Sequence, residues 1–196
     1  MKKDIILAGV GGQGILSIAT VIGSAALAYG LHLKQAEVHG MSQRGGDVQS
    51  NLRLSTEPIH SDLIPRGAAD LIISLEPMEA LRYVPYLASD GWVITNTVPF
   101  VNIPDYPPME SVMAALNQLP HLIAIDVDAI AREAGSPRSA NMVLLGATAF
   151  LDYLDPEKLR DGIRRIFGRK GEDVVAANLK AFDAGLQFAK TNNGRL

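Results

Sequence analysis

The stretch Asp4–Gly14 reads DIILAGVGGQG and runs from an apolar strand directly into a glycine-dense turn. The next segment, 15–29, is apolar almost all the way round, which is typical of a buried helix. Strand, turn and helix predict a βα unit whose helix N-terminus is open to an anion. The spacing Gly9-x-Gly11-x-x-Gly14 matches the fingerprint of dinucleotide-binding turns. A tight turn that lets helix and sheet pack closely explains these glycines equally well.

A second glycine-rich loop spans residues 39–47 and contains one arginine, Arg44, beside two glycines. An arginine among exposed backbone amides suits a phosphate or a carboxylate. The alternative is a plain surface loop in which Arg44 pairs with Asp47 or Glu37. The carboxyl ends of strands in an open α/β sheet are where ligands or partner chains bind. Both glycine-rich loops are therefore predicted to face a ligand or a partner at that edge.

A free-standing NAD(P)-dependent oxidoreductase needs an acid that reads the ribose hydroxyls after the second strand. Glu37 is available, but it lies 23 residues beyond Gly14 and leads into the second glycine-rich loop. The sequence shows no evident Tyr-Lys pair or histidine for hydride transfer. These residues argue against NAD(P), which stays as an alternative.

The remaining sequence alternates strand and helix patterns. Strands are predicted at 31–37, 48–55, 69–75, 92–97 and 121–127, with a short antiparallel return at 59–61 and a turn at 89–91. Helices are predicted at 78–88, 109–118, 128–135, 142–151, from 155–156 onward, and at 172–191. Residues 98–108 form a proline-rich surface loop. This order predicts an α/β fold: a Rossmann-like, doubly wound, mostly parallel mixed sheet with a helical C-terminal tail.

Composition predicts one soluble domain over residues 1–196, with 47% hydrophobic and 20% charged residues. The net charge of −3 predicts no overall attraction to nucleic acid or membrane. Residues 156–196 hold 9 of the 18 Lys and Arg but 5 of the 21 Asp and Glu, a net +4 that indicates a docking surface or solvated helix faces. Segment 15–31 is interrupted by polar residues, and no signal peptide is evident, so the expected location is the cytoplasm.

Catalytic groups are scarce in this chain. The absence of cysteine excludes disulfides, thiolate-held zinc and iron–sulfur clusters bound by its own side chains. The four histidines have no metal-ligand spacing, and only His39, beside the second loop, is a candidate acid–base group. Glu76 and Asp126 end predicted strands, where capping of the next helix is the favoured interpretation. No catalytic residue and no metal site is predicted.

Four segments in this order carry a resemblance to a known family: the turn GVGGQG at 9–14, GMSQRGG at 40–46, the strand at 70–76, and NMVLLG at 141–146. Together they resemble the gamma-type subunit of 2-oxoacid:ferredoxin oxidoreductases, the pyruvate/ketoisovalerate oxidoreductase catalytic domain family, over nearly the whole chain. Within this family, the motif HGMSQRGG at 39–46 makes the chain most similar to the small (beta) subunits of the indolepyruvate enzymes. Pyruvate, 2-oxoisovalerate and 2-oxoglutarate enzymes share the domain, so the substrate stays open.

The resemblance implies a complex that oxidatively decarboxylates a 2-oxoacid to an acyl-CoA and passes electrons to ferredoxin. Thiamine diphosphate and iron–sulfur clusters belong to partner subunits, on which this chain packs, and coenzyme A is a candidate ligand at the interface. A homodimer is a candidate state of the isolated chain. The predicted cofactor contacts are Gly9, Gly11, Gly12, Gln13, Gly14, Ser42, Gln43, Arg44, Gly45 and Gly46. An assembly scaffold without a ligand is the second alternative, beside the NAD(P) enzyme.

Overall fold

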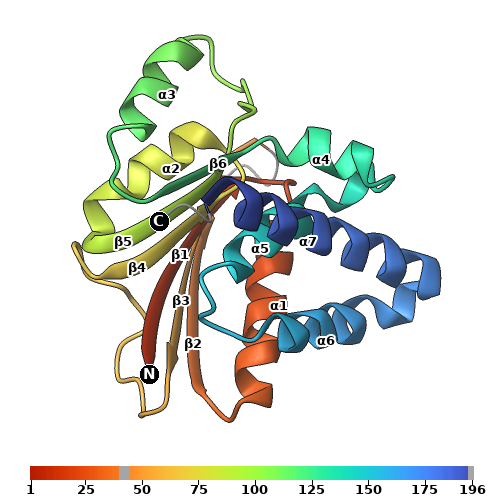
Figure 1. Ribbon diagram of the computed structural model, residues 1–196. Coiled ribbons are helices and arrows are strands. Elements are labelled where there is room, and N and C mark those ends of the chain that lie inside the picture. The colour runs from red at the N-terminus through yellow and green to blue at the C-terminus, as the bar shows by residue number, and fades with distance from the viewer. Residues whose placement is uncertain (40–44, 194–196) are drawn as a thin grey trace.

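Six strands form one mixed sheet in the order β2-β3-β1-β4-β5-β6 (Figure 1). The structure is a computed structural model, and it describes residues 1–39 and 45–193. The strands are β1 Lys2–Val10, β2 His32–His39, β3 Asp47–Ser55, β4 Ala69–Ser74, β5 Leu87–Asn96 and β6 Leu122–Ile125. β1, β4, β5 and β6 run parallel, whereas β3 is antiparallel to both of its neighbours, β1 and β2. The predicted mostly parallel mixed sheet is therefore confirmed.

Helices cover both faces of this sheet. They are α1 Ile15–Ala28, α2 Pro77–Tyr83, α3 Met109–Leu116, α4 Val127–Glu133, α5 Ala140–Ala149, α6 Pro156–Phe167 and α7 Glu172–Asn193. Because side chains alternate along a strand, Ile5 and Leu7 of β1 join a core with α1, α5, α6 and α7, while Ile6 and Ala8 join a second core with α2 and α3. Figure 1 shows these two helix groups on opposite sides of the sheet. The fold is Rossmann-like with a helical C-terminal segment, as predicted.

No helix among the described residues has the length and apolar character needed to cross a membrane. The longest described helix, α7, has 22 residues but carries acidic side chains in its first turn and a basic one in its last turn.

Helices α5 and α7 pack closely against each other, and they cross at a point where each has a glycine. A Cβ atom built on Gly146 of α5 would lie 1.9 Å from the carbonyl oxygen of Phe182, and one on Gly185 of α7 would lie 1.9 Å from that of Val143. Both distances are far below contact distance, so the two backbones approach as closely as they do only because side chains are missing at these positions.

Two predicted boundaries differ from the structure near β5. The predicted turn at 89–91 lies inside β5, where the register with β4 shifts between Ala69 and Leu71. A bulge of this kind accommodates extra residues without ending the strand. Gly91 allows it, since a Cβ there would lie 2.8 Å from the carbonyl oxygen of Ala69. The preceding helix, predicted at 78–88, ends earlier, at Tyr83.

Proline chemistry explains that early end. A 3₁₀ turn, Val84–Tyr86, follows α2 and contains Pro85, which has no backbone N–H for a helical hydrogen bond. At α4, predicted from residue 128, the helix begins one residue earlier, at Val127. Asp126 caps this helix by accepting a hydrogen bond of 2.8 Å from the N–H of Ala129.

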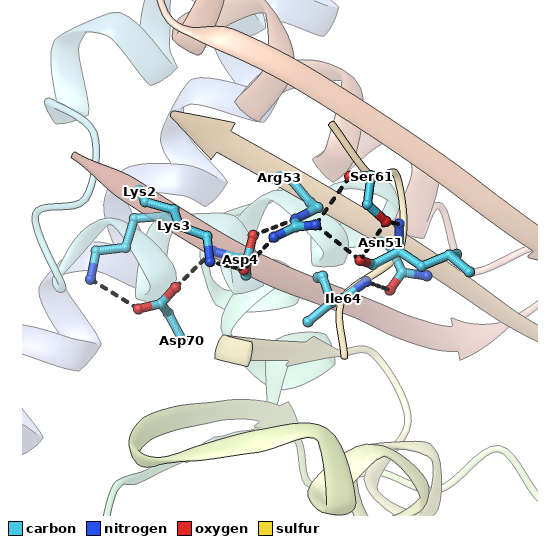
Figure 2. A network of polar contacts seen from close by, with 9 residues as sticks. Lys2, Lys3, Asp4, Asn51, Arg53, Ser61, Ile64 and Asp70 are labelled. Carbon is cyan, nitrogen blue, oxygen red and sulfur yellow. Dashed lines mark hydrogen bonds and ion pairs between the residues drawn. The ribbon is translucent and has the colours of Figure 1, made fainter. Parts of the chain in front are cut away.

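The predicted return strand at 59–61 is wrong, because a side chain binds the backbone there. Arg53 of β3 donates to the carbonyl oxygens of Ser61 at 3.1 Å and Leu63 at 3.0 Å, which holds this segment in an irregular path (Figure 2). The same guanidinium binds the buried carboxylate of Asp4 through Nε at 2.7 Å and Nη2 at 3.1 Å. A two-point arginine–carboxylate pair thus joins β1, β3 and the connection to β4.

Candidate functional site

The first glycine-rich turn, residues 11–14, joins β1 to α1 at the carboxyl edge of the sheet. Gly12 and Gly14 have φ angles of 103° and 86°, values that residues with a Cβ rarely adopt. Within the described chain, the N–H groups of Gly12 and Gly14 make no hydrogen bond, and the first turn of α1 contains no acidic residue. The turn therefore presents free donors and the positive end of a helix dipole, which together suit an anion.

Gln13 braces this turn from within. Its side-chain oxygen accepts a hydrogen bond of 2.7 Å from the N–H of Val10, and its amide nitrogen donates to the carbonyl oxygen of Leu75 at 3.1 Å. Gly9 leaves room for this side chain, since a Cβ there would lie 3.0 Å from the Gln13 oxygen. The sequence pattern alone did not indicate this bracing role, and the ligand contact of Gln13 stays a prediction.

The two glycine-rich loops meet at the carboxyl edge, as predicted. The N–H of Gly11 donates to the carbonyl oxygen of Gly46 at 2.8 Å, and the N–H of Gly45 donates to that of Gly11 at 3.4 Å. Gly45 has a φ of 79°, so this position also favours glycine. Ser42, Gln43 and Arg44 lie outside the described residues, so their predicted contacts stay predictions.

A third segment reaches the same edge: the carboxyl-edge loop, which we define as residues 98–108. The side-chain amide of Asn102 donates to the carbonyl oxygen of Gly45. The hydroxyl of Tyr106 donates to the buried carboxylate of Glu76, which also accepts from the N–H of Phe100 at 3.4 Å. The carboxyl-edge loop is thus attached to the start of α2 and to the second glycine-rich loop at once. One feature of the sequence could have indicated this attachment: Asn102 and Tyr106 are hydrogen-bonding side chains in a loop that is otherwise rich in proline and apolar residues.

Burial raises the pKa of Tyr106, and the hydrogen bond to Glu76 raises that pKa further. The phenol therefore stays protonated and remains a donor across the physiological pH range. Meanwhile the loop leaves four apolar side chains exposed: Val98, Phe100, Val101 and Ile103. An exposed apolar group beside the two glycine-rich loops is the kind of surface that another chain covers.

Replacing Tyr106 with phenylalanine is expected to loosen the carboxyl-edge loop. The change removes one hydrogen bond to a carboxylate, and losing about 1.5 kcal/mol raises the open population by about tenfold. Chymotrypsin cleavage after Phe100 should quicken accordingly, as followed by mass spectrometry. Tyr86→Phe is the control, because among the described residues the Tyr86 hydroxyl makes no hydrogen bond. Equal cleavage rates for both variants would refute the attachment.

The polar residues at the strand ends have structural partners, which confirms the capping interpretation. The Glu76 carboxylate accepts from the N–H of Glu79 at 2.8 Å at the start of α2, as Asp126 does for α4. Asn96, at the end of β5, accepts from the N–H of Val127 at 3.3 Å and donates to the carbonyl oxygen of Leu75 at 3.4 Å. These side chains close the carboxyl edge between the strands.

No group of three or more His, Asp or Glu side chains in the described chain is arranged to hold a metal ion. The donors described at this edge are backbone N–H groups of the first glycine-rich turn, which suit an anion. Asn141 extends this edge toward α5, since its side-chain amide donates to the carbonyl oxygen of Gly14 at 3.2 Å.

Comparison with known proteins places this geometry among oxidoreductase subunits. Residues 4–188 match the family model for pyruvate ferredoxin/flavodoxin oxidoreductase. The indolepyruvate oxidoreductase subunit IorB of Pyrococcus horikoshii is 38% identical, and the match covers 97% of this chain and 98% of that protein. The ketoisovalerate oxidoreductase subunit VorA of Methanothermobacter marburgensis is 30% identical over 95% of this chain, which spans 36% of that protein.

Solved structures agree with the sequence matches. The structure of 2-oxoglutarate:ferredoxin oxidoreductase from Magnetococcus marinus, with 2-oxoglutarate, coenzyme A and succinyl-CoA bound, has a TM-score of 0.76 and 26% identity. That match covers 97% of this chain and 31% of the other. The keto/oxoacid ferredoxin oxidoreductase gamma subunit from Geobacter sulfurreducens has a TM-score of 0.71 at 23% identity, covering 96% of this chain and 99% of the other, a likeness of fold.

Proposed function

This chain belongs to the pyruvate ferredoxin/flavodoxin oxidoreductase family and is a subunit of a 2-oxoacid:ferredoxin oxidoreductase, and from this premise we propose its part in the complex. The complex oxidatively decarboxylates a 2-oxoacid to an acyl-CoA and reduces ferredoxin. Indolepyruvate is the proposed substrate, because relatives at 36–38% identity over 96–97% of this chain are indolepyruvate oxidoreductase subunits.

Thiamine diphosphate and iron–sulfur clusters, held by partner subunits, supply the decarboxylation and the electron transfer. The residues of this chain do not fit either group. It has no cysteine for a cluster, and its described residues hold no cluster of carboxylates or imidazoles for the metal ion that accompanies a diphosphate. Its own part is therefore to bind and position.

The proposed ligand at the carboxyl edge is coenzyme A, whose phosphates match the donors found there. The observation that carries this proposal is the joining of the two glycine-rich loops, Gly11 N–H to Gly46 carbonyl, beside the unneutralised N-terminus of α1. The proposed contacts are the backbone amides of both loops and the guanidinium of Arg44. Support comes from the 26%-identical Magnetococcus marinus structure, which holds coenzyme A.

The proposed partner at this edge is the thiamine-bearing subunit. The exposed side chains of the carboxyl-edge loop supply an apolar surface that adjoins the ligand donors, because Asn102 binds Gly45. Packing here would place the bound ligand between two subunits. Without its partner the same surface favours a homodimer, which size-exclusion chromatography of the isolated chain would detect.

Replacing Arg44 with alanine in the reconstituted complex is expected to raise the KM for coenzyme A by about 10- to 100-fold, the effect of one lost charge-assisted contact. The KM for the 2-oxoacid should stay unchanged, because that substrate reacts in the partner subunit. Steady-state viologen reduction measures both constants. Arg165→Ala, an exposed arginine on α6, is the matched control. An unchanged KM for coenzyme A in a fully assembled Arg44→Ala complex would remove Arg44 from the site.

The substrate and the alternatives are tested with the same complex. The co-purified subunits are assayed with indolepyruvate, pyruvate, 2-oxoisovalerate and 2-oxoglutarate, and indolepyruvate should give the highest kcat/KM. Quenching of protein fluorescence by NADH at low concentration would instead favour a nicotinamide enzyme. A scaffold without a ligand predicts that coenzyme A binding is indifferent to every substitution in the glycine-rich loops.

A further inference from the structure

A cleft of about 640 Å³ adjoins the first turn of α1, where Ser17 lines it, and no residue of the carboxyl-edge loop lines it. Its walls are the 3₁₀ turn Pro137–Ser139, the 3₁₀ turn Gly168–Lys170 and the start of α7. It contains none of the ten residues predicted as cofactor contacts. Its volume falls within the range of about 300–1,000 Å³ that is usual for small-molecule sites, and it is far larger than one inorganic ion requires.

Three largely buried residues that line the cleft have polar side-chain atoms without a partner among the described residues. Ser136 and Ser139 are 6% and 4% exposed, and neither hydroxyl makes a hydrogen bond with any residue in the described ranges. Asn178, which is 6% exposed, donates from its amide nitrogen to the carbonyl oxygen of Val174 at 2.7 Å, while its side-chain oxygen has no partner there. These unpaired atoms are not sealed from solvent, so they are available to a polar ligand in the cleft.

Two cations stand at the same cleft. Arg138 forms no ion pair and no hydrogen bond with the described residues. The ammonium group of Lys170 lies 5.4 Å from the ring centre of Phe167, a contact that leaves its N–H donors available. One acid, Asp173, also lines the cleft and suits a hydroxyl donor. The apolar remainder of the wall includes Phe167 and Val174, which suit a flat or apolar body.

We propose that this cleft binds a nucleotide-sized organic phosphate. Arg138 and Lys170 bind the phosphate group, the hydroxyls of Ser136 and Ser139 donate to its oxygens, and Asp173 accepts from a sugar hydroxyl. The heterocycle packs on the apolar wall. Asn141 connects this cleft to the first glycine-rich turn, because it lines the cleft and binds the carbonyl oxygen of Gly14. The inference goes beyond the proposed function and does not depend on Arg44 or on the carboxyl edge.

Calorimetric titration of the full chain tests the proposal, with adenosine monophosphate, adenosine 3′,5′-bisphosphate and inorganic phosphate as probes. The nucleotides should bind saturably, and inorganic phosphate should bind at least about tenfold more weakly, since it cannot use the apolar wall. Arg138→Gln should weaken nucleotide binding by about tenfold or more. Because Arg138 is exposed, this variant should keep the melting temperature of the parent protein.

Arg165→Gln is the matched control, since it removes the same charge from the same basic region without lining the cleft. An equal loss of binding in both variants would show a diffuse charge effect and overturn the proposal, as would the absence of nucleotide binding at millimolar concentration. Two sources share this chemistry, a free nucleotide and the nucleotide end of coenzyme A. Competition between adenosine 3′,5′-bisphosphate and coenzyme A identifies the second, and independent binding of the nucleotide identifies the first.

Discussion

Replacing Gly146 with alanine is expected to lower the free energy of unfolding by about 3 kcal/mol, although alanine is intrinsically the better helix former. The added methyl group would lie 1.9 Å from the carbonyl oxygen of Phe182 in α7. That obstacle is backbone, so no side-chain rotation removes it and the two helices must separate. Because residues of both α5 and α7 belong to the larger core, separation also opens the packing of Phe182 and Leu145. Urea unfolding followed by circular dichroism measures the loss.

Gly23→Ala is the matched control for this substitution. Gly23 also lies within an apolar helix, but a Cβ there would meet only the flexible end of the Leu33 side chain, with Cδ2 at 3.4 Å and Cδ1 at 3.8 Å. The free energy of unfolding of the Gly23→Ala variant should stay unchanged or rise by up to about 1 kcal/mol, because alanine has the higher helix propensity. Gly185→Ala should resemble Gly146→Ala, and the double variant should lose less than the sum, since the first methyl already separates the helices. Equal stabilities of Gly146→Ala and Gly23→Ala would contradict the close crossing.

Replacing Arg53 with methionine is expected to cost about 3–5 kcal/mol of unfolding free energy, because it leaves a buried carboxylate without its main partner. The side chains of Asp4 and Arg53 are 1% and 11% exposed. Lys2 contacts the same carboxylate at 3.1 Å, but its side chain is 62% exposed and compensates little. The carbonyl oxygen of Ser61 loses the Arg53 donor in the same step, and that of Leu63 keeps only the Ser61 hydroxyl, at 3.4 Å. Thermal and urea unfolding give the difference.

A second substitution separates the buried charge from the packing of Arg53. The double variant Asp4→Leu, Arg53→Met should recover part of the loss, since neither charge is then left buried alone. Arg164→Met is the surface control. Its partner in a 2.7 Å ion pair is Asp161, and both side chains are about half exposed, at 49% and 55%, so the loss should stay below about 1 kcal/mol. If Arg53→Met costs no more than Arg164→Met, the buried pair does not hold β1 to β3.

Local patterns predicted the elements that form the candidate site. The apolar run before Gly9 and the apolar segment after Gly14 predicted β1 and α1, because burial on both faces leaves a continuous apolar signature. Loops after strands of the same direction lie at one edge, so the meeting of the two glycine-rich loops was also predictable, as the bond from Gly11 to Gly46 confirms. The return strand at 59–61 was wrong because its backbone binds Arg53, a residue from another strand.

The roles of single side chains depended on contacts between segments far apart in the chain. Gln13 was predicted to meet a ligand, and only the folded chain shows that it also bridges Val10 and Leu75. The hydrogen bond from Asn102 to Gly45 joins residues that are 57 positions apart in the chain, and no hydrophobic periodicity predicts it. The cleft beside Arg138 is likewise assembled from three segments that are separate in sequence.

The amino-acid sequence by itself determined the α/β class, the family and the two glycine-rich loops, because hydrophobic period, glycine conformation and short motifs are local properties. Only the tertiary structure decided the position of β3 between β1 and β2, the glycine crossing of α5 and α7, and the polar cleft beside the first turn of α1. Each of these depends on which distant surfaces meet. That choice is made by the packing of the whole core, in which every element constrains the others.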